Sequence, residues 1–175
     1  MGKIRAYHPV KLIIGFIFKD AEALNKAEGA LKRRFGRTDY ESQVLNFTQT
    51  DYYESEFGAN LKRKFISFTK LIHPKYLPQI KIITNKLEEK LSGENGKRLI
   101  NIDPGYLDMA KLVLASTKDY NHRIFLDKGI CAEITLSYKG KSFAPWEWTY
   151  RDYKTAEYIA IFNHIRQIYS TQVEK

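Results

Sequence analysis

The sequence is poor in cysteine and has no long apolar segment. Its one cysteine, Cys131, cannot form a disulfide within the chain, so we expect a cytoplasmic protein in a reducing environment. No apolar run approaches the roughly 20 residues that a membrane-spanning helix needs. A membrane is therefore not an expected partner.

Motifs that identify several common enzyme classes are also missing. Residues 93–98 (GENGKR) place a Gly-Lys pair after glycines, but they lack the spacing and the Ser or Thr of a phosphate-binding P-loop. No G-x-G-x-x-G motif follows the first apolar run, and the chain has no H-E-x-x-H motif. A single cysteine cannot build a thiolate zinc site. We predict no metal site and identify no cofactor.

What the sequence does have is an excess of positive charge. Its 175 residues include 29 Lys and Arg against 20 Asp and Glu, a net charge of +9, of which the first 90 residues carry +7. Hydrophobic residues make up 43% of the chain, which is enough to offset the entropy of folding. We expect a single domain over residues 1–175 that encounters anions readily.

The hydrophobic pattern predicts an α+β fold. Residues 11–18 form an apolar run typical of a buried strand, and residues 21–35 repeat apolar side chains at helical spacing between Asp20 and Gly36. Further strands are predicted over residues 44–47, 63–71 and 98–102, with a helix from about residue 80 to residue 91. This βαββαβ order is that of a ferredoxin-like core.

The rest of the chain is predicted to extend this core. Asp103-Pro104-Gly105 is expected to form a turn that ends the fourth strand. Residues 107–116 fit either a short helix or a strand. Residues 123–136 predict a C-terminal antiparallel hairpin, and residues 155–169 predict a closing helix. We expect this extension to pack on a face of the sheet.

Two basic clusters favour binding of an anionic ligand, either a nucleotide or a stretch of RNA. One cluster spans residues 62–64, and the other lies where the hairpin begins, where charge-assisted hydrogen bonds suit a phosphate or carboxylate. The predicted ligand-binding residues are Lys62, Arg63, Lys64, Lys118, His122, Arg123, Trp148 and Tyr150. Phe65, Ile66 and Phe68 also match, loosely, the aromatic strand of RNA-recognition modules. The alternative is that these basic residues form a surface that contacts only solvent and binds no ligand.

A second hypothesis is an enzyme that uses a metal or acid–base chemistry. Residues 50–56 carry three carboxylates beside two tyrosines, and oxygen-rich segments of this kind bind hard cations. The candidate catalytic residues are Asp51, Glu54, Asp103 and His122, provided that the fold brings them together. Helix capping and solvation would explain the same residues without any chemistry.

A third hypothesis is an oligomeric, partner-binding protein. Residues 143–153 hold two Trp and two Tyr, and such density supplies a stacking platform, a lid over the sheet or a contact surface. Trp146 and Trp148 would form that contact.

Four of these segments also carry a family resemblance. Residues 50–54 (TDYYE), 101–106 (NIDPGY), 122–124 (HRI) and 148–153 (WTYRDY) together resemble the domain-of-unknown-function family 4416, a group of short prokaryotic proteins. The resemblance spans nearly the whole chain and brings no established activity with it. Some members are labelled GTP-binding, but this chain has neither a P-loop nor an N-K-x-D motif. Arg151 and Phe57 stand where the family usually has proline and methionine.

Overall fold

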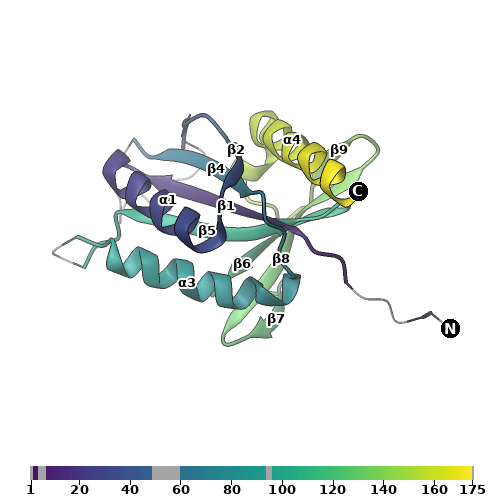
Figure 1. Ribbon diagram of the computed structural model, residues 1–175, viewed down its shortest axis with the longest axis horizontal. Helices are drawn as coiled ribbons and strands as arrows, with labels where there is room; N and C mark the ends of the chain where they lie inside the picture. Colours follow the sequence, from purple (N-terminus) through teal and green to yellow (C-terminus); the bar gives the residue numbers. More distant parts are fainter. Residues whose placement is uncertain (1, 4–6, 49–59, 94–95, 175) are drawn as a thin grey trace.

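The computed structural model of the chain describes residues 2–3, 7–48, 60–93 and 96–174. Within these residues, nine strands form one antiparallel sheet and three α-helices cover its two faces (Figure 1). The strands are β1 (Lys11–Phe18), β2 (Thr38–Glu41), β3 (Leu45–Asn46), β4 (Lys62–Phe68), β5 (Ile100–Leu107), β6 (Lys111–Ser116), β7 (Ile124–Asp127), β8 (Ile130–Lys139) and β9 (Ser142–Pro145). The helices are α1 (Ala21–Phe35), α3 (Leu77–Lys90) and α4 (Ala156–Val173).

The strands follow the order β2-β4-β1-β5-β6-β8-β7 across the sheet. Two short strands lie off this path, β3 against β4 and β9 against β8. In the described part of the chain, no helix is long and apolar enough to cross a membrane. The mixed α+β fold predicted from the sequence is confirmed.

The fully buried strand β1 separates two hydrophobic cores. Leu12, Ile14 and Phe16 pack with the apolar faces of α1 and α3, whereas Ile13 on the other face packs with α4. Successive side chains of a strand point to opposite faces, so an uninterrupted apolar run fits a strand covered on both sides. The strand predicted over residues 11–18 is therefore confirmed.

Helix α1 also matches its prediction over residues 21–35. The Asp20 carboxylate accepts hydrogen bonds from the backbone N–H groups of Glu22 and Ala23, and this caps the helix. Gly36 ends the helix with a φ of +96°, a conformation that residues with a side chain rarely adopt. Lys32, Arg33 and Arg34 lie in the last turn, where the helix dipole favours positive charge.

The strand predicted over residues 44–47 is present but shorter, as β3 (Leu45–Asn46), which pairs with β4. The main edge strand on this side is β2, whose sequence TDYE has no apolar alternation to identify it. Its polar side chains instead contact the neighbouring strands. Asp39 forms an ion pair with the fully buried Lys11 of β1 at 2.5 Å and accepts a hydrogen bond from Ser67 of β4 at 2.6 Å.

The turn predicted at residues 103–105 is also wrong, because β5 runs straight through it to Leu107. Pro104 pairs with Ile14 of β1 on one side. On the other side, pairing with β6 covers only Gly105 to Leu107. A proline has no N–H to donate to a neighbouring strand, so it is tolerated where the sheet opens. From Pro104 back to Ile100, β5 therefore lies beside a split in the sheet.

The chain after β5 continues the same sheet. Residues 107–116, which fit either a helix or a strand, form the end of β5 and the strand β6. The predicted hairpin corresponds to β7 and β8, and the closing helix corresponds to α4, which extends four residues further to Val173. Helix α4 lies on the face opposite α1 and α3, as expected for an extension that covers the sheet (Figure 1).

Glu41 provides a pH-dependent test of the β2 edge. Burial acts to raise the pKa of Glu41, but hydrogen bonds from Lys32, Thr38 and Lys64 outweigh it and lower the pKa to about 2. A depressed carboxyl pKa stabilises the folded state above the ordinary value of 4.5, and the effect is lost as the pH falls toward 2. We expect Glu41→Gln to be less stable than wild type at pH 7 and the difference to shrink between pH 4.5 and 2.

Urea unfolding at a series of pH values measures this difference. Glu22→Gln is the matched control, because it removes an exposed carboxylate that pairs with Lys26. A Glu41→Gln difference that stays constant down to pH 2 would contradict the proposed ion pairs.

Candidate functional site

A buried arginine crosses the centre of the sheet on the α4 face. Arg63 of β4 is 1% exposed, and its guanidinium passes over Gly15 of β1 toward Asp103 of β5. A Cβ on Gly15 would lie 2.9 Å from Arg63 Nη2, so only glycine leaves room for this path. We call Gly15, Arg63, Asp103, Asp152 and Tyr153 the arginine site.

Aromatic rings enclose the Arg63 guanidinium. The rings of Phe65, Tyr153 and Tyr158 have their centroids 4.6, 5.1 and 5.9 Å from its central carbon. Guanidinium groups are attracted to aromatic faces, and the attraction increases when water is excluded. The Tyr153 hydroxyl also accepts a hydrogen bond from Arg63 Nη2 at 2.5 Å. These rings fix the guanidinium in place.

Acidic groups keep Arg63 charged despite its burial. Burial acts to lower the pKa of Arg63, whereas Tyr153, Asp152 and Asp103 raise it above its ordinary value. The Asp103 contact is long, with 3.5 Å between Nη1 and Oδ2. The Nε–H group of Arg63 is buried and has no hydrogen-bond acceptor in the described structure. A buried unpaired donor of this kind calls for an explanation.

Asp103 is the more accessible member of this ion pair. Its side chain is 24% exposed, and its Oδ2 accepts a hydrogen bond from Asn101 at 2.7 Å. Lys81 reaches it from α3, with Nζ 3.7 Å from Oδ1 and 3.1 Å from the carbonyl oxygen of Ile102. Asp103 therefore lies between two cations at the split beside β5.

A second polar group is centred on Glu133 of β8, which is 2% exposed. Its Oε2 accepts a hydrogen bond from Arg123 Nε at 3.0 Å and lies 3.0 Å from His122 Nε2. Its Oε1 accepts a hydrogen bond from Thr135 at 3.3 Å. Arg123 makes further hydrogen bonds to Ser116 and to the Lys118 carbonyl oxygen. We call His122, Arg123, Glu133 and Thr135 the Glu133 cluster.

Tyr150 lies beside the Glu133 cluster. Its hydroxyl accepts a hydrogen bond from Arg123 Nη2 at 2.6 Å. Burial raises the pKa of Tyr150, Arg123 acts to lower it, and Glu133 and Asp103 raise it further. The candidate residues His122, Arg123 and Tyr150 thus belong to one polar network around Glu133, whereas Asp103 belongs to the arginine site.

The segment with the two tryptophans closes this network. Strand β8 pairs with β7 over residues 130–132 and with β9 over residues 136–139, which leaves an interval between them. In that interval Trp148 Nε1 donates to the Ile134 carbonyl oxygen at 3.1 Å, and Thr149 Oγ1 donates to the Thr135 carbonyl oxygen at 2.6 Å. The rings of Trp146 and Trp148 are stacked 5.2 Å apart, and His122 stacks 5.7 Å from Trp148. Because the Trp148 ring already stacks on Trp146 and His122, this arrangement favours a lid over an open stacking platform.

The three consecutive basic residues at 62–64 do not form one surface. Arg63 is buried on the α4 face, as a strand's alternation requires. Lys64 lies on the other face and pairs with Glu28 at 2.6 Å and Glu41 at 3.0 Å. Lys62 is exposed, and Lys118 is exposed at the start of the Glu133 cluster. Ligand binding by Lys62, Lys64 and Lys118 stays a prediction.

The carboxylates of the enzyme hypothesis are only partly placed. Asp51 and Glu54 lie outside the described residues. Asp103 contacts Arg63, Asn101 and Lys81, whereas His122 contacts Glu133, so the two candidates lie in different groups of the described structure. Among the described residues, no group of three or more His, Cys, Asp or Glu is arranged to hold a metal ion.

Several members of the site are not among the predicted site residues. Lys81, Asn101, Glu133, Asp152 and Tyr153 are all buried. Glu133 is a charged residue within the alternating apolar run of β8, which is a detectable signal because a buried charge has to be paired. Lys81 on α3 gives no such signal, since lysines are common on exposed helix faces.

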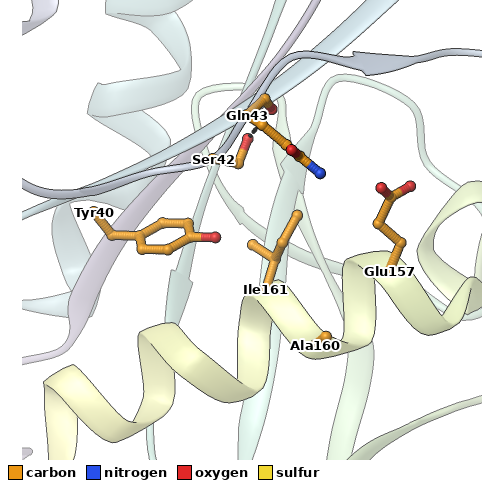
Figure 2. Close-up of a pocket in the computed structure, with 6 residues that line it drawn as sticks. All are labelled: Tyr40, Ser42, Gln43, Glu157, Ala160 and Ile161. Atoms are coloured by element: carbon orange, nitrogen blue, oxygen red, sulfur yellow. Dashed lines mark hydrogen bonds between the residues drawn. The ribbon is translucent and has the colours of Figure 1, made fainter.

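A hollow of about 400 Å³ lies elsewhere, between α4 and the chain that follows β2 (Figure 2). Tyr40, Gln43 and Glu157 line it with polar groups, and Ile161 supplies an apolar wall. None of its lining residues belongs to the arginine site or the Glu133 cluster. The polar network therefore lies outside this hollow.

Comparison with known proteins gives one match. The family model described as Domain of unknown function (DUF4416) matches residues 8–169, which confirms the resemblance seen in the sequence. No curated protein and no solved structure matches the chain.

Gly15 allows a direct test of the arginine site. We expect Gly15→Ala to lower the free energy of unfolding by about 1–3 kcal/mol, because its methyl group overlaps the guanidinium and the Phe65 ring. Gly29→Ala in α1 is the control, since a Cβ there lies 3.5 Å from a flexible arginine tip. We expect that control to be about 0.5–1 kcal/mol more stable, as is usual for Gly→Ala within a helix. Urea unfolding that gives both variants the same sign would contradict this packing.

Proposed function

The chain belongs to the DUF4416 family, and from the geometry of its site we propose that it binds a small ligand carrying a phosphate or carboxylate group at the arginine site. The single observation behind this proposal is the Arg63 guanidinium. It is fully buried, its carboxylate contact is long, and its Nε–H group has no acceptor in the described structure.

Arg63 has more hydrogen-bonding capacity than its surroundings use. A guanidinium carries five N–H donors, and the described partners are the Tyr153 hydroxyl and Asp103. An unsatisfied buried donor costs about 1–3 kcal/mol, and more for a charged group. A phosphate or carboxylate oxygen would satisfy Nε–H with a charge-assisted hydrogen bond. Lys81, on the far side of Asp103, would add a second positive charge.

The geometry favours a small anion, including a nucleotide, over RNA bound across the sheet. RNA-recognition modules stack bases on aromatic side chains of an open sheet face. Here Phe65 is 1% exposed beneath Tyr158 and Phe162, while Ile66 and Phe68 pack with α1 on the opposite face. A ligand would approach the site from Asp103, whose side chain is 24% exposed whereas that of Arg63 is 1% exposed.

Acid–base catalysis is the second candidate function, and one observation favours it. Asp103 is a partly exposed carboxylate that Asn101, Arg63 and Lys81 surround with donors. A carboxylate fixed beside bound substrate is suited to accept a proton. Conversion of a bound nucleotide by wild type but not by Asp103→Asn would support this role, whereas unchanged ligand after long incubation with wild type would count against it.

We also propose that residues 11–107 form a ferredoxin-like core. The strand order β2-β4-β1-β5, with antiparallel neighbours, supports this arrangement. Helices α1 and α3 pack together on one face, as the βαββαβ order requires. The opposite face, which carries the arginine site, would then be the face that α4 covers in this family.

A cytoplasmic location completes the proposal. Cys131 is buried and forms no disulfide, which fits a reducing compartment. Fractionation of cells that express the chain with a small tag tests this location.

Isothermal titration calorimetry with inorganic phosphate, followed by AMP, GMP and GTP, tests the binding proposal. We expect at least one of these probes to bind wild type and Arg63→Lys to weaken that binding about tenfold or more. The reason is that a hydrogen bond to a charged group is worth about 1.5–3 kcal/mol. Urea unfolding of Arg63→Lys establishes that the variant is folded under the titration conditions.

Lys62→Gln is the matched control. It removes one positive charge from the neighbouring position of the same strand, but from an exposed side chain away from the arginine site. We expect it to leave binding nearly unchanged at physiological salt, where surface charges are screened. Binding that both variants weaken equally would indicate general attraction to a basic surface. That outcome, or no binding of any probe, would overturn the proposal.

A further inference from the structure

Three exposed aromatic rings lie side by side just before β1 and α3. Tyr7 is 48% exposed, Tyr76 is 51% exposed, and His73 between them is also exposed. The ring centroids of Tyr7 and His73 are 6.4 Å apart, and those of His73 and Tyr76 are 6.3 Å apart. We call Tyr7, His73 and Tyr76 the aromatic patch. A group of exposed rings of this kind marks a surface that contacts another molecule.

Backbone hydrogen bonds bring these rings together from distant parts of the chain. The Val10 N–H donates to the Ile72 carbonyl oxygen at 2.7 Å, and the Ile72 N–H donates to the Val10 carbonyl oxygen at 2.9 Å. The Tyr169 hydroxyl of α4 donates to the Pro9 carbonyl oxygen at 2.8 Å. The segment before β1 is therefore held against the connection between β4 and α3, at the end of the sheet where α3 begins (Figure 1).

The rings of the aromatic patch do not cover one another. The planes of Tyr7 and His73 are tilted by 42° and those of His73 and Tyr76 by 78°, unlike the two stacked tryptophans. His73 Nδ1 accepts a hydrogen bond from the backbone N–H of Lys75 at 3.1 Å, so Nε2 is the ring nitrogen left to contact a ligand. The patch thus offers open ring surface and a hydrogen-bonding group.

Positive side chains surround the aromatic patch. Lys75 is exposed, and its Nζ lies 5.2 Å from the centre of the Tyr76 ring. Lys70 is exposed just before the patch, and the exposed Arg37 is its neighbour because the Arg37 carbonyl oxygen accepts a hydrogen bond from Thr69 N–H. No ion pair among the described residues involves Arg37, Lys70 or Lys75. Their charges are therefore available to an anionic partner.

We propose that the aromatic patch binds single-stranded nucleic acid, with bases against the rings and phosphates beside Arg37, Lys70 and Lys75. Proteins that bind single strands combine these two features, aromatic side chains for the bases and a positive surface along the backbone. The members of the patch are two phenols and an imidazole, with no aliphatic side chain, which favours nucleic acid over the acyl chains of a membrane. None of them belongs to the arginine site, so this function is separate from the binding proposed there.

Fluorescence anisotropy with labelled oligouridine and oligothymidine tests this proposal and distinguishes RNA from DNA. We expect wild type to bind at least one of them and Tyr76→Ala to weaken that binding about tenfold, the loss typical of one base–ring contact. Tyr120→Ala is the matched control: Tyr120 is also 51% exposed, but it lies beside Arg123 of the Glu133 cluster. This variant and Arg63→Lys should bind like wild type. Circular dichroism establishes that all three are folded.

The salt dependence of binding tests the role of the charges. We expect Lys75→Gln to reduce the slope of log affinity against log salt concentration by about 0.7, because one phosphate contact with a single strand is lost. Lys62→Gln removes an exposed lysine at the start of β4, away from the patch, and should leave the slope unchanged.

Three results would overturn the proposal. One is that neither oligonucleotide binds wild type. Another is that Tyr120→Ala weakens binding as much as Tyr76→Ala, which would indicate general attraction to exposed rings. The third is that wild type binds vesicles containing phosphatidylserine but neither oligonucleotide, which would assign the patch to a membrane surface.

Discussion

The buried Arg63 guanidinium is the constraint on which the α4 face of this protein depends. A fully buried charge is tolerated only where charge partners, hydrogen bonds and aromatic contacts replace water. Gly15 leaves the space, Asp103 supplies the carboxylate, and Tyr153 supplies both a ring and a hydroxyl. Tyr153 in turn stacks 5.7 Å from Phe162 of α4, so the position of this helix is linked to the arginine. The same contacts leave Arg63 Nε without an acceptor, which is why a structural arginine is also a candidate for ligand binding.

The split beside β5 explains why so many polar groups meet on this face. Hydrogen bonds along the whole length of β5 and β6 would use the backbone N–H and C=O groups of both strands and bring their side chains close together. Because pairing stops at Gly105, Lys81 reaches the Ile102 carbonyl oxygen and the Asp103 carboxylate from α3. On the far side of the split, Glu133 is enclosed by Arg123 and His122. On that side, Trp148 and Thr149 bond the backbone of β8 and Tyr150 bonds Arg123, so the segment 146–153 is held against Glu133.

The sequence predicted the elements whose signals are local and missed those that tertiary contacts decide. Helix α1 has a cap at each end and a periodic apolar face, and its predicted bounds match the structure. β2 has no apolar alternation, and the D-P-G segment of β5 has the composition of a turn, so both are explained only by the strands beside them. For the site, the Lys62–Lys64 cluster was visible as charge, yet strand alternation places Arg63 on the α4 face and Lys64 on the α1 face. Lys81 had no local signal, because its role depends on Asp103, a partner far away in the chain.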